Sequence, residues 1–345
     1  MGDSLLDRLA SGTVLCAEGY LFELERRGYL QAGAFVPEVV LDHPEIVAGL
    51  HRDFVHAGSD VVEAFTYYAH REKLRLIGRE ADLEKLNRQA LAAAAGVARE
   101  TGVLLAGDVC NTNIWLDGQH PDDNGVRAMF AEQVDWAAQA GVDYIIGETF
   151  QFLGEALAAL EVIRSAGLPS VITLAAHQGD TTREGVTLAD ACRRLQDAGA
   201  DVVGLNCIRG PQTMLPLLAA IVEAVDVPVA ALPVPYRTTA DEPTFQSLTD
   251  PRGTPLPEGR AFPVALDALT CTRYDIAAFT HAALDTGVRY LGLCCGAGPH
   301  HVRAMAEAMG RIPPASRFSA DMSKHAYLGT DASLRPQNLA FAEHL

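Results

Sequence analysis

The sequence predicts an α/β protein of the (β/α)8 type, a closed TIM-type barrel of parallel strands inside a ring of helices. Three observations support this. Eight short apolar runs recur along the chain, each separated from the next by a longer segment of helical periodicity. The runs end in polar or reactive residues. Several helical segments end in a glycine just before the next run, as helix C-termini commonly do. Eight strands alternating with helices indicate a closed barrel.

The expected strands can be followed in order along the chain. They cover residues 13–17, 60–65, 103–107, 144–147, 170–174, 202–207, 227–232 and 288–291, and the last leads into Gly-Leu-Cys-Cys-Gly at 292–296. The clearest helices cover residues 38–57, 83–101, 126–140, 155–166, 188–198 and 273–286. We therefore expect one domain over residues 1–314, followed by a tail at 315–345 that forms an extra helix or contacts a partner.

One interruption breaks this regular alternation. Residues 233–262, between the seventh strand and the helix at 273–286, are rich in proline, glycine, threonine and acidic side chains. A loop of that length in a barrel is usually a lid or a binding loop.

Composition limits the class of function. The 345 residues carry a formal net charge of −17, which argues against a nucleic acid or an acidic membrane as partner and favours a small substrate. The N-terminus has no basic region followed by an apolar core, so we expect a cytoplasmic protein. The most apolar windows are far shorter than the roughly 20 residues that cross a bilayer, so no membrane span is expected. The sequence leaves open whether the chain forms a homo-oligomer.

Three of the seven cysteines lie at expected strand ends. Cys207 closes the sixth strand, and Cys294 and Cys295 follow the eighth. Three thiolates at the mouth of one barrel favour Zn²⁺ with an open fourth position, where a substrate thiol would ionise and attack a methyl group. The other reading of a free cysteine is a small buried core residue. We prefer that reading for the remaining cysteines, Cys16, Cys110, Cys192 and Cys271.

Other residues converge on the same mouth if the barrel forms, because active sites lie at the C-terminal ends of the strands. Besides the cysteines they are Glu18, Tyr68, Asp108 and Glu148. Glu18 and Glu148 suit the ammonium of an amino acid, although helix capping or ion pairing would equally explain them. Phe35, Tyr67 and Tyr68 suit a methylated cation through cation-π attraction, and ordinary packing explains such aromatics as well. Three histidines, His177, His300 and His301, are left out of the site.

Two segments resemble metal motifs of a known family. Gly204-Leu205-Asn206-Cys207 and Gly292-Leu293-Cys294-Cys295-Gly296 are similar to those of the zinc-dependent homocysteine S-methyltransferases, and of the betaine-homocysteine methyltransferases most of all. The resemblance extends over residues 12–314 and implies a (β/α)8 barrel. It also implies methyl transfer from a quaternary ammonium or sulfonium donor to homocysteine, giving methionine.

Residue roles follow from the resemblance position by position. Cys207, Cys294 and Cys295 match the zinc ligands. Glu18 and Glu148 match the pair that holds the homocysteine amino group, and Gly19 matches a close backbone approach to that amino acid. Tyr68 matches an aromatic residue of the donor pocket. We group Asn206 with the two glutamates as catalytic, and assign Gly19, Phe35, Tyr67, Tyr68 and Thr149 to substrate binding.

Three departures from the family pattern bear on the methyl donor. Phe35 and Thr149 stand where glycine-betaine enzymes have tryptophan and tyrosine, Leu293 replaces a glycine, and the tail differs from the long C-terminal arm of those enzymes. We therefore expect a larger betaine such as proline betaine, or a sulfonium such as dimethylsulfoniopropionate or S-methylmethionine.

Other functions stay open at this stage. The first is a zinc methyltransferase that uses S-methylmethionine, S-adenosylmethionine or a different thiol acceptor. The second is a non-catalytic zinc-binding regulatory barrel. The third, a thiol-redox protein using Cys294 and Cys295, ranks last because adjacent cysteines form a strained ring and no Cys-X-X-Cys spacing is present.

Overall fold

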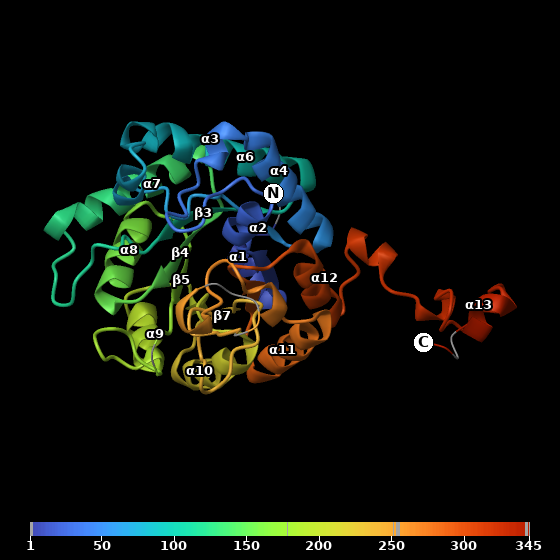
Figure 1. Cartoon of the computed structure of the whole chain (residues 1–345). Coiled ribbons are helices and arrows are strands. Elements are labelled where there is room, and N and C mark those ends of the chain that lie inside the picture. Colours follow the sequence, from blue (N-terminus) through green and yellow to red (C-terminus); the bar gives the residue numbers. More distant parts are fainter. Residues whose placement is uncertain (1–2, 178, 251, 253–255, 342–343, 345) are drawn as a thin grey trace.

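The computed structural model describes residues 3–177, 179–250, 252, 256–341 and 344. Its strands are all parallel and confirm the predicted barrel (Figure 1). They are β1 (Val14–Ala17), β2 (Val61–Glu63), β3 (Leu104–Cys110), β4 (Tyr144–Phe150), β5 (Ser170–Leu174), β6 (Val202–Asn206), β7 (Val229–Leu232) and β8 (Tyr290–Leu293). Hydrogen bonding runs in the order β1-β8-β7-β6-β5-β4-β3-β2.

The barrel closes between β1 and β2 through the residues that precede β2. The Asp60 backbone N–H donates to the Leu15 carbonyl oxygen at 2.8 Å, and the Leu15 N–H donates to the Asp60 carboxylate at 2.8 Å. The Ser59 hydroxyl donates to the same carbonyl at 3.3 Å. Side chains thus replace part of the backbone ladder here and satisfy groups that an open edge would leave exposed.

Helices form the outer ring, with one long helix after each strand (Figure 1). The ring consists of α4 (Pro44–Ala57), α6 (Leu83–Thr101), α7 (Val126–Ala140), α8 (Leu153–Ser165), α9 (Leu188–Asp197), α10 (Pro211–Ala224), α11 (Arg273–Thr286) and α12 (Pro299–Ala308), and α12 packs on α4 to close it. Shorter helices are α1 (Leu5–Ser11), α2 (Tyr20–Arg26), α3 (Val39–Asp42), α5 (Arg71–Leu76) and α13 (Pro336–Phe341). None of the helices in the described residues is long and apolar enough to cross a membrane.

Two apolar clusters fill the fold. The larger one lies between the strands and the ring of helices. The smaller one fills the barrel, where Leu5 and Leu9 of α1 cover the N-terminal end of the strands. Tyr144 and Tyr290, the first residues of β4 and β8, belong to the same cluster, and their hydroxyls are hydrogen-bonded at 2.8 Å. Because side chains fill the interior of the barrel, only its C-terminal end is left for chemistry.

Several predicted boundaries differ from the structure, among them that of β3, which continues past Gly107 to Cys110. The helix expected at residues 38–57 is divided into α3 and α4, because His43 precedes Pro44 and the residue before a proline disfavours helical geometry. Strand β4 does not stop at Gly147 but continues to Phe150, with a change of register between these two residues. Glu148 and Thr149 therefore lie within the strand rather than after it.

The long loop packs on the barrel, whereas the tail extends away from it. In the loop at 233–262, residues 251 and 253–255 lie outside the described residues. Its aromatic side chains pack on the barrel mouth, with the ring of Phe245 5.9 Å and that of Phe262 6.3 Å from the ring of Phe22. The tail carries α13 away from the barrel (Figure 1) and exposes Phe318 and Leu328. The domain division at residue 314 stays a prediction.

Candidate metal and substrate site

The three predicted metal ligands come together at the C-terminal end of the barrel. Cys207 follows β6, and Cys294 and Cys295 follow β8; all three are buried, and their sulfur atoms lie within 4.8 Å of one another. The sulfur atoms of Cys294 and Cys295 are 3.9 Å apart. Tetrahedral zinc with bonds of about 2.3 Å to sulfur separates its thiolates by about 3.8 Å. The donor set and its spacing therefore fit a metal ion such as zinc.

Charge is shared unevenly among these thiols. Hydrogen bonds from the thiols of Cys294 and Cys295 hold the pKa of Cys207 well below its usual value. Burial, together with the thiolate charge of Cys207, raises the pKa of Cys294. A cluster that keeps one thiolate in a buried place attracts a cation, because burying an uncompensated negative charge is costly.

Backbone conformation places Cys207 in this cluster. Its φ of 55° and the φ of 59° at Ile208 are both in the left-handed region, which non-glycine residues rarely adopt. The Cys207 N–H donates to the Leu232 carbonyl oxygen at 2.8 Å, which ties this turn to β7. Strain of this kind is commonly found at functional sites.

Four carboxylates line a small cavity next to the sulfur atoms. Glu18 and Glu148 were expected there, Asp108 was expected at the mouth, and Glu63 was not singled out. Burial, then the charge of neighbouring carboxylates, raises the pKa of Glu18, Glu63 and Asp108 well above the usual range. Burial and the Cys207 charge raise the pKa of Glu148 to about 8. The cavity therefore suits a cation that relieves this repulsion.

The Glu63 position carried a signal in the sequence. It is the only charged residue between Val61 and Phe65 in an apolar run, and a buried strand rarely contains an unpaired carboxylate without a functional reason. One carboxylate oxygen of Glu63, like one of Glu18, is buried without a hydrogen-bond partner among the described residues.

Asn206 links the cavity lined by the four carboxylates, called the acid cavity below, to the three cysteines. Its side-chain amide nitrogen donates to the carboxylate of Glu148 and to the Thr149 hydroxyl at 2.9 Å, and it lies 3.9 Å from the sulfur of Cys294. The Thr149 hydroxyl donates to the Glu148 carboxylate at 3.0 Å. Asn206 is completely buried, so these contacts fix the orientation of Glu148.

Gly19 lies where the chain leaves β1 and approaches the loop after the cysteine pair. A Cβ atom at this position would be 2.3 Å from the carbonyl oxygen of Ala297. The glycine is therefore required by this close approach of two backbone segments, whatever contact it makes with a substrate.

A second cavity opens outward from Cys207 and Cys295. The aromatic and polar residues predicted for donor binding, Phe35, Tyr67, Tyr68 and Thr149, line it. Residues not predicted for the site line it too: Phe22, Asn111, Gln151, His177, Phe245, Gln246 and Phe262. Phe245, Gln246 and Phe262 come from the loop at 233–262. Aromatic surface from that loop thus supplements Phe35, which stands where glycine-betaine enzymes were expected to have the larger ring of tryptophan.

Tyr68 already has a cationic neighbour. The Lys73 ammonium lies 3.9 Å from the centre of the Tyr68 ring, and the ring of Tyr67 lies 4.2 Å away. Tyr68 itself has a positive φ of 60°, and its backbone N–H donates to the sulfur of Cys110 at 3.2 Å. Lys73 therefore competes with any methylated cation for the electron-rich surface of this ring.

The residues assigned to ordinary roles have such roles. Cys16, Cys110, Cys192 and Cys271 are buried. His301 accepts a hydrogen bond from the Gly298 N–H at 3.2 Å at the start of α12, which is a capping contact. His177 differs, because it lines the second cavity although it was not predicted for the site.

Residues 12–309 match the profile of a family described as homocysteine S-methyltransferase. The chain belongs to the homocysteine S-methyltransferase family. Among its relatives, betaine--homocysteine S-methyltransferase 1 of Xenopus tropicalis is 37% identical over 327 residues, covering 90% of this chain and 78% of the relative. S-methylmethionine--homocysteine S-methyltransferase BHMT2 of Pongo abelii is 34% identical, covering 90% and 84%.

Solved structures agree on the fold. The metallated form of the homocysteine methyltransferase MmuM from Escherichia coli superposes with a TM-score of 0.65, covering 87% of this chain and 97% of that one, at 19% identity. Its oxidized form superposes with a TM-score of 0.66. The family fold thus extends over nearly all of the barrel described here.

Proposed function

We propose that this protein transfers a methyl group from a small sulfonium or quaternary ammonium donor to homocysteine, giving methionine. The observation that carries the proposal is the position of the three cysteine sulfurs between two cavities of different chemistry. One cavity is lined by carboxylates and the other by aromatic rings. The names of the family relatives, which include betaine and S-methylmethionine enzymes, support the same reaction.

Cys207, Cys294 and Cys295 would hold Zn²⁺. When bound, the ion lowers the pKa of a substrate thiol at its open position and so supplies a nucleophile at neutral pH. The rest of the site positions the two substrates. The cavity lined by the aromatic rings is called the donor cavity below. A sulfur at the cluster lies between the acid cavity and the donor cavity, because Cys295 lines both of them.

Glu18 and Glu148 would bind the ammonium of homocysteine. Their carboxyl groups face a buried cavity in which burial and crowding raise their pKa, and a bound ammonium would stabilise their ionised forms. Asn206 keeps Glu148 oriented toward that cavity. Two charge-assisted contacts of this kind orient the amino acid so that its thiol is directed at the sulfur cluster.

Aromatic side chains would hold the donor cation. Phe22, Phe35, Phe245 and Phe262 form one connected group of rings, and Tyr67 and Tyr68 form another on the same cavity. The new bond joins the homocysteine sulfur to the methyl carbon while the bond from that carbon to the donor nitrogen or sulfur breaks. The electron pair stays on the donor, which leaves neutral at that atom.

The direct test is methionine formation by the purified, zinc-loaded protein. Homocysteine would be supplied with glycine betaine, proline betaine, dimethylsulfoniopropionate, S-methylmethionine or S-adenosylmethionine in separate reactions. We expect turnover with a betaine other than glycine betaine or with a sulfonium donor. No methionine from any donor, at one equivalent of bound zinc, would contradict the proposal.

A further inference from the structure

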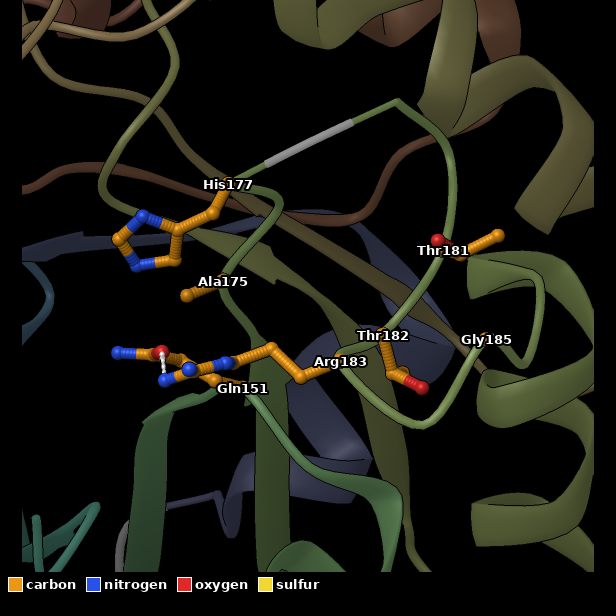
Figure 2. Close-up of a pocket in the computed structure, with 7 residues that line it drawn as sticks. All are labelled: Gln151, Ala175, His177, Thr181, Thr182, Arg183 and Gly185. Atoms are coloured by element: carbon orange, nitrogen blue, oxygen red, sulfur yellow. Dashed lines mark hydrogen bonds between the residues drawn. The ribbon is translucent and has the colours of Figure 1, made fainter. Parts of the chain in front are cut away.

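A third cavity adjoins the donor cavity at the C-terminal ends of β4 and β5. Gln151, His177 and Arg183 line it together with Thr181 and Thr182 (Figure 2). Figure 2 shows the side chains of Gln151, His177 and Arg183 on the same side of the strand ends. Gln151 and His177 also line the donor cavity. The two spaces therefore share a wall made of polar groups.

The loop after β5 holds Arg183 at this wall. The carboxylate of Glu184 accepts hydrogen bonds from the backbone N–H groups of Leu153 and Gly154, the latter at 2.9 Å, which attaches the loop to the start of α8. The Arg183 N–H donates to the Gln151 carbonyl oxygen at 2.9 Å. Although Arg183 is exposed, its backbone is thus fixed to the strand end.

The guanidinium itself is oriented by two contacts. One nitrogen of Arg183 donates to the side-chain oxygen of Gln151 at 3.1 Å, and its central carbon lies 5.1 Å from the centre of the Phe152 ring. No carboxylate of the described residues forms an ion pair with it. Because the Gln151 oxygen accepts from Arg183, the Gln151 NH2 group is left to donate.

A second arginine, Arg209, lies close to His177, and Asp180 is a neighbouring carboxylate of Arg209. Arg209 is buried and donates to the carbonyl oxygens of Ala176 at 3.0 Å and Gly179 at 2.7 Å, which lie before and after His177 in the chain. Burial lowers the pKa of His177, the charge of Cys207 opposes this, and the charges of Arg183 and Arg209 add to the lowering. The donor cavity beside it has aromatic and amide walls with no carboxylate among its described lining residues.

We propose that Arg183, with Gln151 and His177, binds the carboxylate of a zwitterionic methyl donor whose cationic group occupies the donor cavity. This assignment rests on the proposed function and deepens it. Aromatic rings can stabilise only the onium group. The acid group of the same molecule needs hydrogen-bond donors and positive charge. The shared wall supplies both at the outer end of the cavity.

The test compares two donors that differ only in this acid group. Dimethylsulfoniopropionate and its methyl ester carry the same sulfonium. We expect Arg183→Gln to raise the KM for the acid about five- to tenfold, with kcat within about twofold, and to leave the KM for the ester unchanged. Arg193→Gln is the matched control, because Arg193 is an exposed arginine of the neighbouring helix α9 that pairs with Asp190.

The outcomes separate this assignment from the proposed function. An equal change for acid and ester, or no change for either, would overturn the carboxylate assignment while turnover continues. A raised KM for homocysteine instead would assign Arg183 to the acceptor and would also overturn it. No methyl transfer by the wild-type protein with any donor would overturn the proposed function and this assignment together.

Discussion

The side-chain oxygen of Asn206, in β6, accepts a hydrogen bond from the backbone N–H of Thr149, in β4, at 2.9 Å, although the two residues are 57 positions apart in the chain. The same amide donates through its nitrogen to the Glu148 carboxylate. One buried side chain thus fixes both the irregular end of β4 and the acid next to it. Asn206 also directly precedes Cys207, so the same short segment positions the acid cavity and the three cysteines.

Removing this support should weaken acceptor binding. We expect Asn206→Ala to raise the KM for homocysteine about tenfold or more, because a hydrogen bond to a charged group contributes roughly 1.5–3 kcal/mol. Asn206→Asp keeps an acceptor for the Thr149 N–H but adds a carboxylate next to Glu148, so it should bind homocysteine still less well. Steady-state kinetics checks both, and an Asp variant better than the Ala variant would contradict the assigned role.

Metal content tests the cysteine cluster directly. Cys207→Ala should reduce bound zinc from about one equivalent to a small fraction of that, since one of the three thiolate ligands is lost. Cys192→Ala is the matched control, because Cys192 is equally buried but belongs to α9 and packs in the outer core. Elemental analysis of dialysed protein gives the ratio. Zinc retained by Cys207→Ala would remove Cys207 from the ligand set.

Donor preference should respond to position 149. Thr149→Tyr adds an aromatic ring to the donor cavity, so we expect the ratio of kcat/KM for glycine betaine to that for dimethylsulfoniopropionate to rise. Thr149→Ser keeps the hydroxyl that contacts Glu148 and Asn206 and should leave the ratio near the wild-type value. An unchanged ratio in the tyrosine variant would place the donor elsewhere.

Glu63 should make the substrate-free protein less stable as pH rises. Its pKa is raised in the folded state, so folding retains a proton that the unfolded chain releases above about pH 4.5, and stability falls by up to about 1.4 kcal/mol per pH unit. Glu63→Gln should therefore raise Tm progressively above that pH. Thermal unfolding from pH 5 to 8 measures this, with Glu223→Gln on the exposed side of α10 as control. A pH-independent difference would contradict the linkage.

The barrel was predictable because its signals are local. Apolar runs and glycine caps such as Gly102 and Gly141, which do adopt the left-handed conformation, mark strand and helix ends directly. The cysteine cluster was predictable for a related reason. In a parallel barrel all strand ends meet at one face, so Cys207 and Cys294 had to approach each other once the strands were counted correctly.

Other parts of the site depend on contacts that no local pattern records. Arg183 lies in a loop, and it is brought to the cavity by the contacts of Glu184 with α8 and by its own backbone hydrogen bond to Gln151. Phe245 and Phe262 come from an irregular loop whose path the sequence does not determine. Glu63 was overlooked because a single acid in an apolar run gives no spacing to interpret, although its isolation was itself a signal.

The left-handed backbone at Cys207 and Thr149 has a consequence for how this protein would change under selection. Glycine adopts such a conformation without strain, and a β-branched residue such as Thr149, at φ 61°, adopts it least readily. Cys207→Gly and Thr149→Gly would relieve the backbone and remove the chemistry at once. In a library selected for activity, glycine should therefore be absent from both positions even though it would relieve the backbone there.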